Sequence, residues 1–208
     1  MSTHIYAFGS VCRGEIDLGS DIDLLACSDG PTTHIDSDKY SIYTYERLRS
    51  LWSEGNPFAW HLYLEAKLLF SSDNSDFLGD LGAPSEYTAA AQDLGKFRKL
   101  FEKSNNELVS TGNSSVFNLS CVFLAIRNFA TCHSLSTGKP VFSRKSPLLV
   151  SPSLEISPKA FSILTRARLL STRGYGSNIT HQDMAVATRA IAAIPLWMDI
   201  LERSVNND

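Results

Sequence analysis

Residues 8–25 decide the fold and read Phe-Gly-Ser-Val-Cys-Arg-Gly-Glu-Ile-Asp-Leu-Gly-Ser-Asp-Ile-Asp-Leu-Leu. A short apolar run, Ile5–Phe8, leads into this stretch and stops at Gly9-Ser10. Ten residues then separate Ser10 from an Asp-Ile-Asp triplet, which opens a second apolar run, Leu24–Ala26. Short apolar runs bounded by turn residues are typical of buried strands. The stretch therefore predicts two strands joined by a compact connection.

The Asp-Ile-Asp triplet predicts a pair of carboxylates on one face of the second strand. Side chains on a strand repeat every two residues, so a strand over Ser20–Ala26 would project Asp21 and Asp23 together, about 6–7 Å apart. Two carboxylates on a rigid element suit a divalent cation. Ile22 and Leu24 would then point to the opposite side and pack in the core.

Gly9-Ser10 predicts a tight turn whose backbone N–H groups and hydroxyl suit a phosphate. This turn, ten intervening residues and Asp21-x-Asp23 together resemble the signature of the DNA polymerase β nucleotidyltransferase superfamily. Arg13-Gly14 and Gly19-Ser20 are also similar to its minimal nucleotidyltransferase and aminoglycoside adenylyltransferase branches.

The resemblance implies a transfer of a nucleoside monophosphate from a nucleoside triphosphate (NTP), with ATP expected, to an acceptor hydroxyl, and the release of pyrophosphate. Asp21 and Asp23 are the expected metal ligands and catalytic residues, with Mg²⁺ as cofactor and two ions possible in the site. Ser10 and the N–H groups that follow Gly9 would hold the β- and γ-phosphates. The acceptor is left open between a small molecule, a protein and an RNA end.

Two further residues of the stretch are candidates for nucleotide binding. Arg13 could pair with a phosphate through two parallel hydrogen bonds; the alternative is a surface arginine that offsets Glu15 and Asp17. Ser20 is expected to cap or orient the aspartate loop.

The family pattern also has a third carboxylate on a neighbouring strand, and this sequence departs from it. The predicted third strand, Tyr40–Tyr45, contains no acid. Asp38 precedes it, Glu46 follows it, and Glu65 stands before a predicted fourth strand; none of the three is preferred. A chain with two aspartates could hold a metal-bound nucleotide and catalyse slowly, or require an acid from a partner.

The charge of the chain is unevenly distributed. Residues 1–93 hold fifteen Asp and Glu against five Lys and Arg, a net −10, whereas residues 94–173 hold three against twelve, a net +9. An acidic metal-binding part beside a basic segment favours a cleft for an anionic substrate, although basic helices can also simply be soluble. Lys139 and Lys145 are the preferred cations for the triphosphate, and Arg144 is a lesser candidate.

The fold class expected is α/β (α+β), a small mixed-sheet nucleotidyltransferase domain at 1–84 followed by a four-helix bundle at 85–208. Ser71–Pro84 is rich in Ser, Asp and Gly and is the expected linker. Strands are predicted at Ile5–Phe8, Ser20–Ala26, Tyr40–Tyr45 and Leu68–Phe70, and helices at Glu46–Ser53, Glu86–Val109, Val116–Ala130, Lys159–Leu170 and from Thr180 onward, the last kinked at Pro195.

Composition predicts an ordinary globular protein with 43% hydrophobic and 20% charged residues among 208. The sequence shows no apolar run near the roughly 18 residues that a membrane span needs, and no pattern of a signal peptide. The four cysteines have no CxxC spacing, which favours reduced thiols. We therefore expect a cytoplasmic protein without membrane contact; a homodimer is left open.

A second class of function comes from the helical half. Arg127 and His133 fit the R-x(4–6)-H spacing of HEPN ribonuclease domains, although the motif is short and a histidine near a helix C-terminus has a structural explanation. The alternative function is therefore a nucleotide-binding or toxin–antitoxin type protein, a minimal nucleotidyltransferase fused to a HEPN-like helical domain with weak or no transferase activity.

Overall fold

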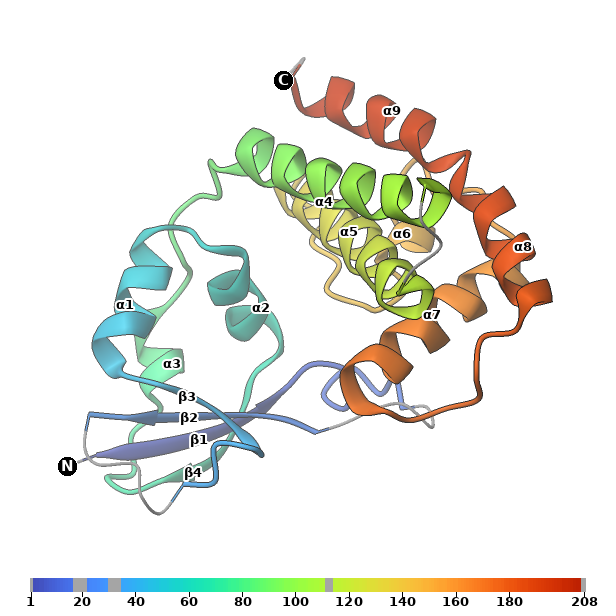
Figure 1. The fold of residues 1–208 in the computed structure, drawn as a ribbon. Helices are drawn as coiled ribbons and strands as arrows, with labels where there is room; N and C mark the ends of the chain where they lie inside the picture. Colours follow the sequence, from blue (N-terminus) through green and yellow to red (C-terminus); the bar gives the residue numbers. More distant parts are fainter. Residues whose placement is uncertain (1, 17–21, 30–34, 111–113, 207–208) are drawn as a thin grey trace. The chain divides into compact units, whose positions relative to one another are not determined.

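The computed structural model describes residues 2–16, 22–29, 35–110 and 114–206. The chain divides into two compact units, Met1–Thr88 and Ala89–Asp208 (Figure 1). The first unit carries the sheet and the second is helical, which confirms the predicted α+β class with a C-terminal helical region.

A four-stranded mixed sheet forms the base of the first unit. Its strands are β1 (Thr3–Phe8), β2 (Asp23–Ser28), β3 (Tyr40–Tyr43) and β4 (Lys67–Ser71), in the spatial order β3-β2-β1-β4. β1 is antiparallel to both β2 and β4, and β3 is parallel to β2. The antiparallel register pairs Phe8, the last residue of β1, with Asp23, the first residue of β2. Phe8 and Asp23 therefore lie side by side at one end of the sheet.

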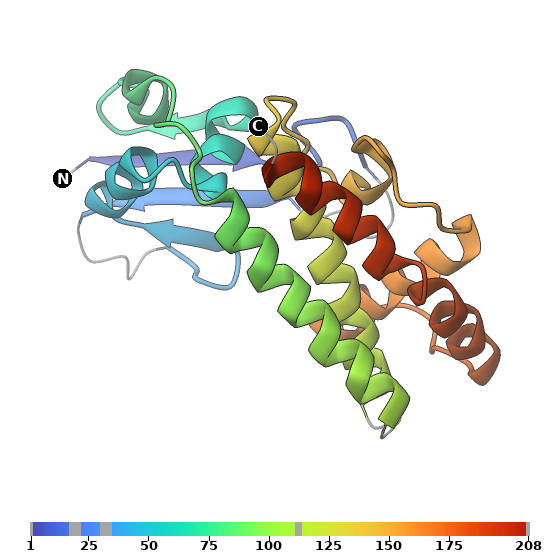
Figure 2. The ribbon, with the colours of Figure 1, turned by 90° about the horizontal axis from the view of Figure 1, so that it is seen from above.

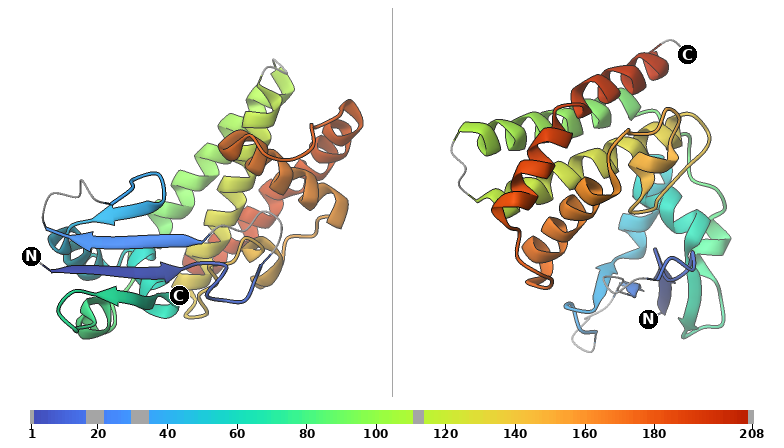
Figure 3. Two further views of the ribbon diagram at one scale, coloured as in Figure 1. Left: turned by 90° about the horizontal axis from the view of Figure 1, so that it is seen from below. Right: turned by 90° about the vertical axis from the view of Figure 1, so that its right-hand side faces the viewer.

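Three helices cover one face of this sheet: α1 (Tyr45–Ser53), α2 (Pro57–Glu65) and α3 (Phe77–Leu81) (Figures 1 and 3). A side chain caps the start of each helix, and at α3 the Asp76 carboxylate accepts from the Gly79 N–H. The Thr44 hydroxyl accepts from the Arg47 N–H and the Asn56 side chain accepts from the Phe58 N–H, which satisfies donors that a helix start leaves without partners. Pro57 occupies the first turn of α2, where its missing N–H costs nothing.

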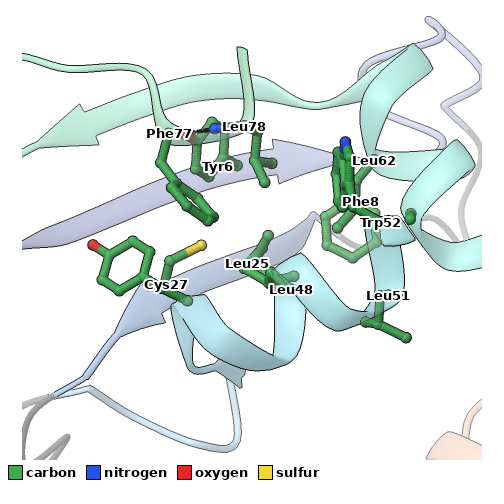
Figure 4. Packing of buried hydrophobic residues seen from close by; sticks show 12 residues of the cluster. Tyr6, Phe8, Leu25, Cys27, Leu48, Leu51, Trp52, Leu62, Phe77 and Leu78 are labelled. Carbon is green, nitrogen blue, oxygen red and sulfur yellow. Dashed lines mark hydrogen bonds between the residues drawn. The ribbon is translucent and has the colours of Figure 1, made fainter. Parts of the chain in front are cut away.

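The core of the first unit lies between β1 and β2 and the three helices (Figure 4). The buried cluster comprises Tyr6, Phe8, Leu25, Cys27, Tyr45, Leu48, Leu51, Trp52, Ala59, Leu62, Phe77 and Leu78. Phe77 and Leu78 belong to α3, inside the segment predicted as a linker. That segment is therefore in part a packed element of the first unit.

The prediction that Ile22 and Leu24 pack in the core is wrong. Ile22 is 61% exposed and Leu24 is only half-buried, whereas Leu25 and Cys27 are fully buried. Because alternate residues share a face, Asp23 lies on the helix-covered side of β2 with Leu25 and Cys27. Asp23 itself is exposed, since it begins the strand at the end of the sheet. A pattern of Asp-Ile-Asp-Leu-Leu does not reveal which of the two faces the helices cover.

The second unit is built around α5 (Ser115–Ser136), which is buried on most sides and contains the helix predicted at Val116–Ala130. The other helices are α4 (Ala90–Ser110), α6 (Ser146–Leu149), α7 (Pro158–Arg173), α8 (His181–Ile191) and α9 (Ile194–Asn206). α5 packs against α4, α7 and α9, and Figure 2 shows α4 and α9 running beside it. The four predicted helices are therefore present, and the short α6 lies between the second and the third of them in the chain.

The last predicted helix is broken rather than kinked. α8 begins with a capping box, in which Thr180 and Asp183 exchange side-chain to backbone hydrogen bonds. The helix ends at Ile191, and α9 starts at Ile194 with Pro195 as its second residue. A proline within a helix removes one hydrogen bond and clashes with the preceding turn, whereas the first turn of a new helix tolerates it. The break places Pro195 where its cost is small.

Two segments, Ser115–Ser136 and His181–Val205, have the length and hydropathy to cross a membrane. In the first, 67% of the most apolar window is buried within the structure, and in the second 33%. Length and composition do not distinguish a span from a core helix, and the burial of α5 accounts for its apolar sequence. The expectation of no membrane contact stays a prediction.

Leu25→Ala should lower the free energy of unfolding of the first unit by about 2–5 kcal/mol, because the side chain is fully buried between β2 and α1. Leu69→Ala is the control, since Leu69 is 60% exposed on β4 and its loss should cost no more than about 0.5 kcal/mol. Denaturant unfolding followed by tryptophan fluorescence measures both, because Trp52 lies in the same core. Equal effects would contradict the packing described here.

Candidate functional site

The turn after β1 brings Gly9 against the carboxylate of Asp23. Gly9 has a positive φ of 79°, which residues with a side chain rarely adopt. A Cβ placed on Gly9 would lie 2.4 Å from Asp23 Oδ2, well inside van der Waals contact. Only glycine therefore fits at this position, and the reason is the close approach of an acidic side chain to the turn.

The connection that follows is a series of turns through Gly14. Arg13 N–H donates to the Gly9 carbonyl at 3.3 Å, and Glu15 N–H donates to the Ser10 carbonyl at 2.9 Å. Gly14 also has a positive φ, of 73°, and a Cβ there would meet no atom within 4 Å. These bonds fold residues 9–15 back on themselves and hold Ser10 next to the end of β1.

Arg13 is engaged by two carboxylates. Its Nη2 lies 3.0 Å from Glu15 Oε2, and its Nη1 donates to Glu65 Oε2. The Arg13 side chain is 19% exposed, so these contacts are partly shielded from water. The pairing with Glu15 agrees with the alternative of an arginine that offsets nearby acids, and Glu65 is a further acid that Arg13 contacts. Asp17, the other acid of that alternative, lies outside the described residues. Whether Arg13 also meets a phosphate stays a prediction.

Glu65 makes contacts at the candidate site that the sequence alone does not reveal. It ends α2, its side chain is only 10% exposed, and it accepts from Arg13 and lies 2.8 Å from His61 Nε2. The spacing of His61 and Glu65, four residues apart on a helix, was the available signal. β4 runs antiparallel to β1 with Ala7 opposite Lys67, so Glu65 lies just beyond that pair, toward the Gly9 end of β1.

The electrostatic surroundings of Cys12 show that these groups gather at one place. Burial raises the pKa of the Cys12 thiol, with Lys67 lowering it and Glu65 raising it. Arg13 and Asp23 act on the same thiol with smaller effects. Residues from the turn, from the start of β2, from the end of α2 and from the start of β4 therefore lie around one thiol at the end of the sheet.

The predicted metal ligands are only partly covered by the structure. Asp23 is placed as described above, whereas Asp21 and Ser20 lie outside the described residues. Among the residues that are described, no group of three or more His, Cys, Asp or Glu side chains could hold a metal ion. A carboxylate is the hard oxygen ligand that Mg²⁺ prefers, so Asp23 is a suitable ligand for the expected ion. A site with two carboxylate ligands would also need Asp21.

The three candidates for a third acid are not equivalent in the structure. The parallel register of β2 and β3 pairs Leu24 with Tyr40, the first residue of β3, and the four residues of β3 include no acid. Asp38 stands one residue before Lys39, and Glu46 lies in the first turn of α1. Glu65 differs from both, because it contacts Arg13, which belongs to the turn that follows Gly9.

Residues 2–80 match a family model described as "Nucleotidyltransferase domain". This region is a nucleotidyltransferase domain, which is consistent with the polymerase β-like superfamily. The match covers the sheet with α1 and α2 and ends within α3, so the nucleotidyltransferase domain corresponds to the first unit. A comparison with curated proteins found no match.

The remaining sequence candidates lie in the second unit. Lys139 and Lys145 are exposed in the connection between α5 and α6. His133 is buried, its Nε2 lies 2.9 Å from the Ser204 hydroxyl of α9, and burial lowers its pKa. Arg127 lines a pocket against α7 instead. The structure therefore places Arg127 and His133 on different faces of α5 and does not bring them together.

Gly9→Ala should destabilise the nucleotidyltransferase domain more than Gly14→Ala does. Both residues have similar positive φ angles, and each alanine carries a backbone cost of about 1–2 kcal/mol. Only the Cβ at position 9 also collides with Asp23. Thermal unfolding of both variants measures the difference.

An Asp23→Ala background should remove part of the extra cost at position 9, because it removes the colliding carboxylate. The expected coupling is about 0.5–3 kcal/mol. A Gly9→Ala cost that is the same with and without Asp23 would contradict the contact.

Proposed function

We propose that the protein catalyses the Mg²⁺-dependent transfer of a nucleoside monophosphate from an NTP, ATP first among the candidates, to an acceptor hydroxyl. The observation that carries the proposal is the contact of the Asp23 carboxylate with the Gly9-Ser10 turn, within a nucleotidyltransferase domain. A carboxylate next to a phosphate-binding turn is the arrangement that a metal-bound triphosphate requires.

In the proposed reaction the acceptor oxygen attacks the α-phosphorus. The bond from that phosphorus to the bridging oxygen breaks, pyrophosphate leaves, and the acceptor proton passes to a base. Asp21 and Asp23 would hold Mg²⁺, which neutralises phosphate charge when bound. The Ser10 hydroxyl and the N–H groups after Gly9 would hold the β- and γ-phosphates, Ser20 would orient the aspartate loop, and Arg13 would exchange a carboxylate partner for a phosphate.

A second candidate is a nucleotide-binding protein with weak transferase activity. One observation favours it: β3, the strand that pairs with β2, carries no acid among Tyr40–Tyr43 that could serve as the third carboxylate. Glu65 could supply the missing carboxylate only by leaving Arg13 and His61. The two candidates differ in turnover and share the nucleotide site.

Asp21→Asn combined with Asp23→Asn should abolish Mg²⁺-dependent NTP binding and reduce pyrophosphate release to background, because both carboxylate charges are lost. The fold should persist, since Asp23 is exposed and the core of β2 is formed by Leu25 and Cys27. Binding of each NTP by titration, and transfer from α-labelled NTPs to pools of protein, RNA and aminoglycoside-type acceptors, are the measurements.

A matched control is Asp29→Asn combined with Asp80→Asn, two exposed carboxylates of the same domain that lie near His4, at the opposite end of β1 from Phe8. It removes the same charge away from the Gly9 turn and should leave Mg²⁺-dependent NTP affinity within about twofold. Unchanged affinity in the Asp21 and Asp23 variant would overturn the site. Tight binding without transfer to any acceptor would favour the second candidate.

Lys139→Ala combined with Lys145→Ala should weaken NTP binding more than nucleoside binding, if these exposed lysines meet the triphosphate. The loss should shrink as salt rises, because screening already removes part of the attraction. Titrations with an NTP and its nucleoside at two salt concentrations test this. An equal effect on both ligands, or none, would show that the lysines serve another partner.

A further inference from the structure

Arg13 contacts two carboxylates through two different edges of its guanidinium group. Its Nε lies 3.1 Å and its Nη2 lies 3.0 Å from Glu15 Oε2. Its Nη1, on the other side of the group, donates to Glu65 Oε2. Paired guanidinium donors fit the oxygens of a carboxylate or of a phosphate. The Nε–Nη2 edge, which now holds Glu15, therefore has the geometry that a phosphate group requires.

The two carboxylates differ in their access to water. The Glu15 side chain is 41% exposed, whereas the side chains of Glu65 and Arg13 are 10% and 19% exposed. An ion pair that is open to water contributes little to stability, because water and salt screen it. A shielded carboxylate that loses its partner keeps an uncompensated charge, which costs much more. Glu15 is therefore the partner that Arg13 can give up, and Glu65 is the partner that it keeps.

Glu65 is itself held in place by His61, which belongs to the same helix. His61 Nε2 lies 2.8 Å from Glu65 Oε2, the oxygen that also accepts from Arg13. The His61 ring packs edge to face against Phe8, with 5.5 Å between the ring centroids. Phe8 is the last residue of β1 and precedes the series of turns that contains Arg13. Arg13 is thus connected, through Glu65 and His61, to the strand end from which its own turn begins.

Glu15 lies next to Ser10, one of the residues proposed to bind the phosphates. The Glu15 N–H donates to the Ser10 carbonyl at 2.9 Å, so the two backbones are adjacent. The Glu15 carboxylate contacts the paired donors of Arg13, which would also accept a phosphate. A phosphate that binds at Ser10 would therefore meet Glu15 as a competitor for this edge of Arg13.

We propose that Glu65, held by His61, is a positioning residue for Arg13, and that Glu15 occupies the edge of Arg13 that binds a phosphate of the NTP. When the NTP binds, one of its phosphates replaces Glu15, while Glu65 keeps its contact with Nη1. The proposal rests on the function proposed above, in which the first unit binds an NTP at the Gly9-Ser10 turn. It gives opposite roles to two carboxylates of the same charge.

Glu15→Gln and Glu65→Gln should change the affinity for ATP in opposite directions, although each removes one negative charge and charge alone predicts tighter binding in both. Glu15→Gln should tighten ATP binding by about two- to fivefold, because a competitor in a surface ion pair is removed. Glu65→Gln should weaken it by at least about threefold, because Arg13 loses its fixed partner. Titration of the full-length protein with ATP in the presence of Mg²⁺ measures both effects.

Two comparisons separate positioning from a general loss of structure. Adenosine carries no phosphate, so its affinity should change by less than about twofold in either variant. In an Arg13→Gln background, which should itself bind ATP more weakly, Glu65→Gln should cause no further weakening. Damage to the fold would instead weaken binding in both backgrounds.

Glu54→Gln is the matched control for the change of charge. Glu54 is an exposed glutamate of the same unit that pairs with an arginine, Arg47, at 3.1 Å. Its substitution removes the same charge and should change the ATP affinity by less than about twofold. Thermal unfolding shows whether each variant is folded. If Glu65→Gln does not fold, His61→Phe takes its place, since it keeps a ring against Phe8 and removes the contact with Glu65; weaker ATP binding is again expected.

Tighter ATP binding by folded Glu65→Gln would overturn the proposal, because Glu65 would then be a competitor like Glu15. Unchanged or weaker binding by Glu15→Gln would also overturn it, as would native affinity in Arg13→Gln. ATP binding that requires Asp21 and Asp23 but is unaffected by Glu15→Gln and Glu65→Gln would overturn this proposal and leave the proposed function intact. Absence of ATP binding by the native protein would overturn both.

Discussion

The contact between Gly9 and the Asp23 carboxylate is the constraint on which the first unit depends. The register of β1 and β2 puts Phe8 opposite Asp23, so the turn after β1 must pass directly beside an acidic side chain. A positive φ and the absence of a Cβ at position 9 make this passage possible. The turn at Gly9 places Ser10 at the end of β1. The chain then turns back at Gly14, and Arg13 contacts Glu65.

The sequence predicts most elements of both units because their signals are local. Thr44, Asn56 and Thr180 cap helices within a few residues, and the apolar run of α5 requires burial on all sides. The errors concern information that is not local. The face of β2 that enters the core depends on which side of the sheet the helices cover, and the local sequence does not contain this information. The prediction that Ile22 lies in the core is therefore wrong, because Ile22 is exposed. α3 was missed because its two buried residues, Phe77 and Leu78, stand within a polar segment.

The candidate site follows the same rule. Gly9, Ser10 and Asp23 are recognisable from spacing alone, because strand–turn–strand geometry fixes their proximity. The Arg13–Glu65 pair joins residues 52 positions apart, and no periodicity in the sequence links them. The pocket lined by Arg127, Arg144, Arg168 and Arg173 likewise draws on α5, α7 and the connection after α5. The sequence shows that this segment is basic, but it does not show that these side chains line one pocket.

Charge in the first unit also limits what that unit can do alone with a triphosphate. Three of its basic side chains are already paired with carboxylates: Arg13 with Glu15 and Glu65, Lys39 with Asp36, and Arg47 with Glu54. Using any of them for a phosphate means giving up an existing partner, which costs part of the attraction gained. Residues 1–93 hold only five Lys and Arg in all. A triphosphate bound to the first unit, as proposed above, therefore needs cations other than these three side chains, and bound Mg²⁺ would supply them.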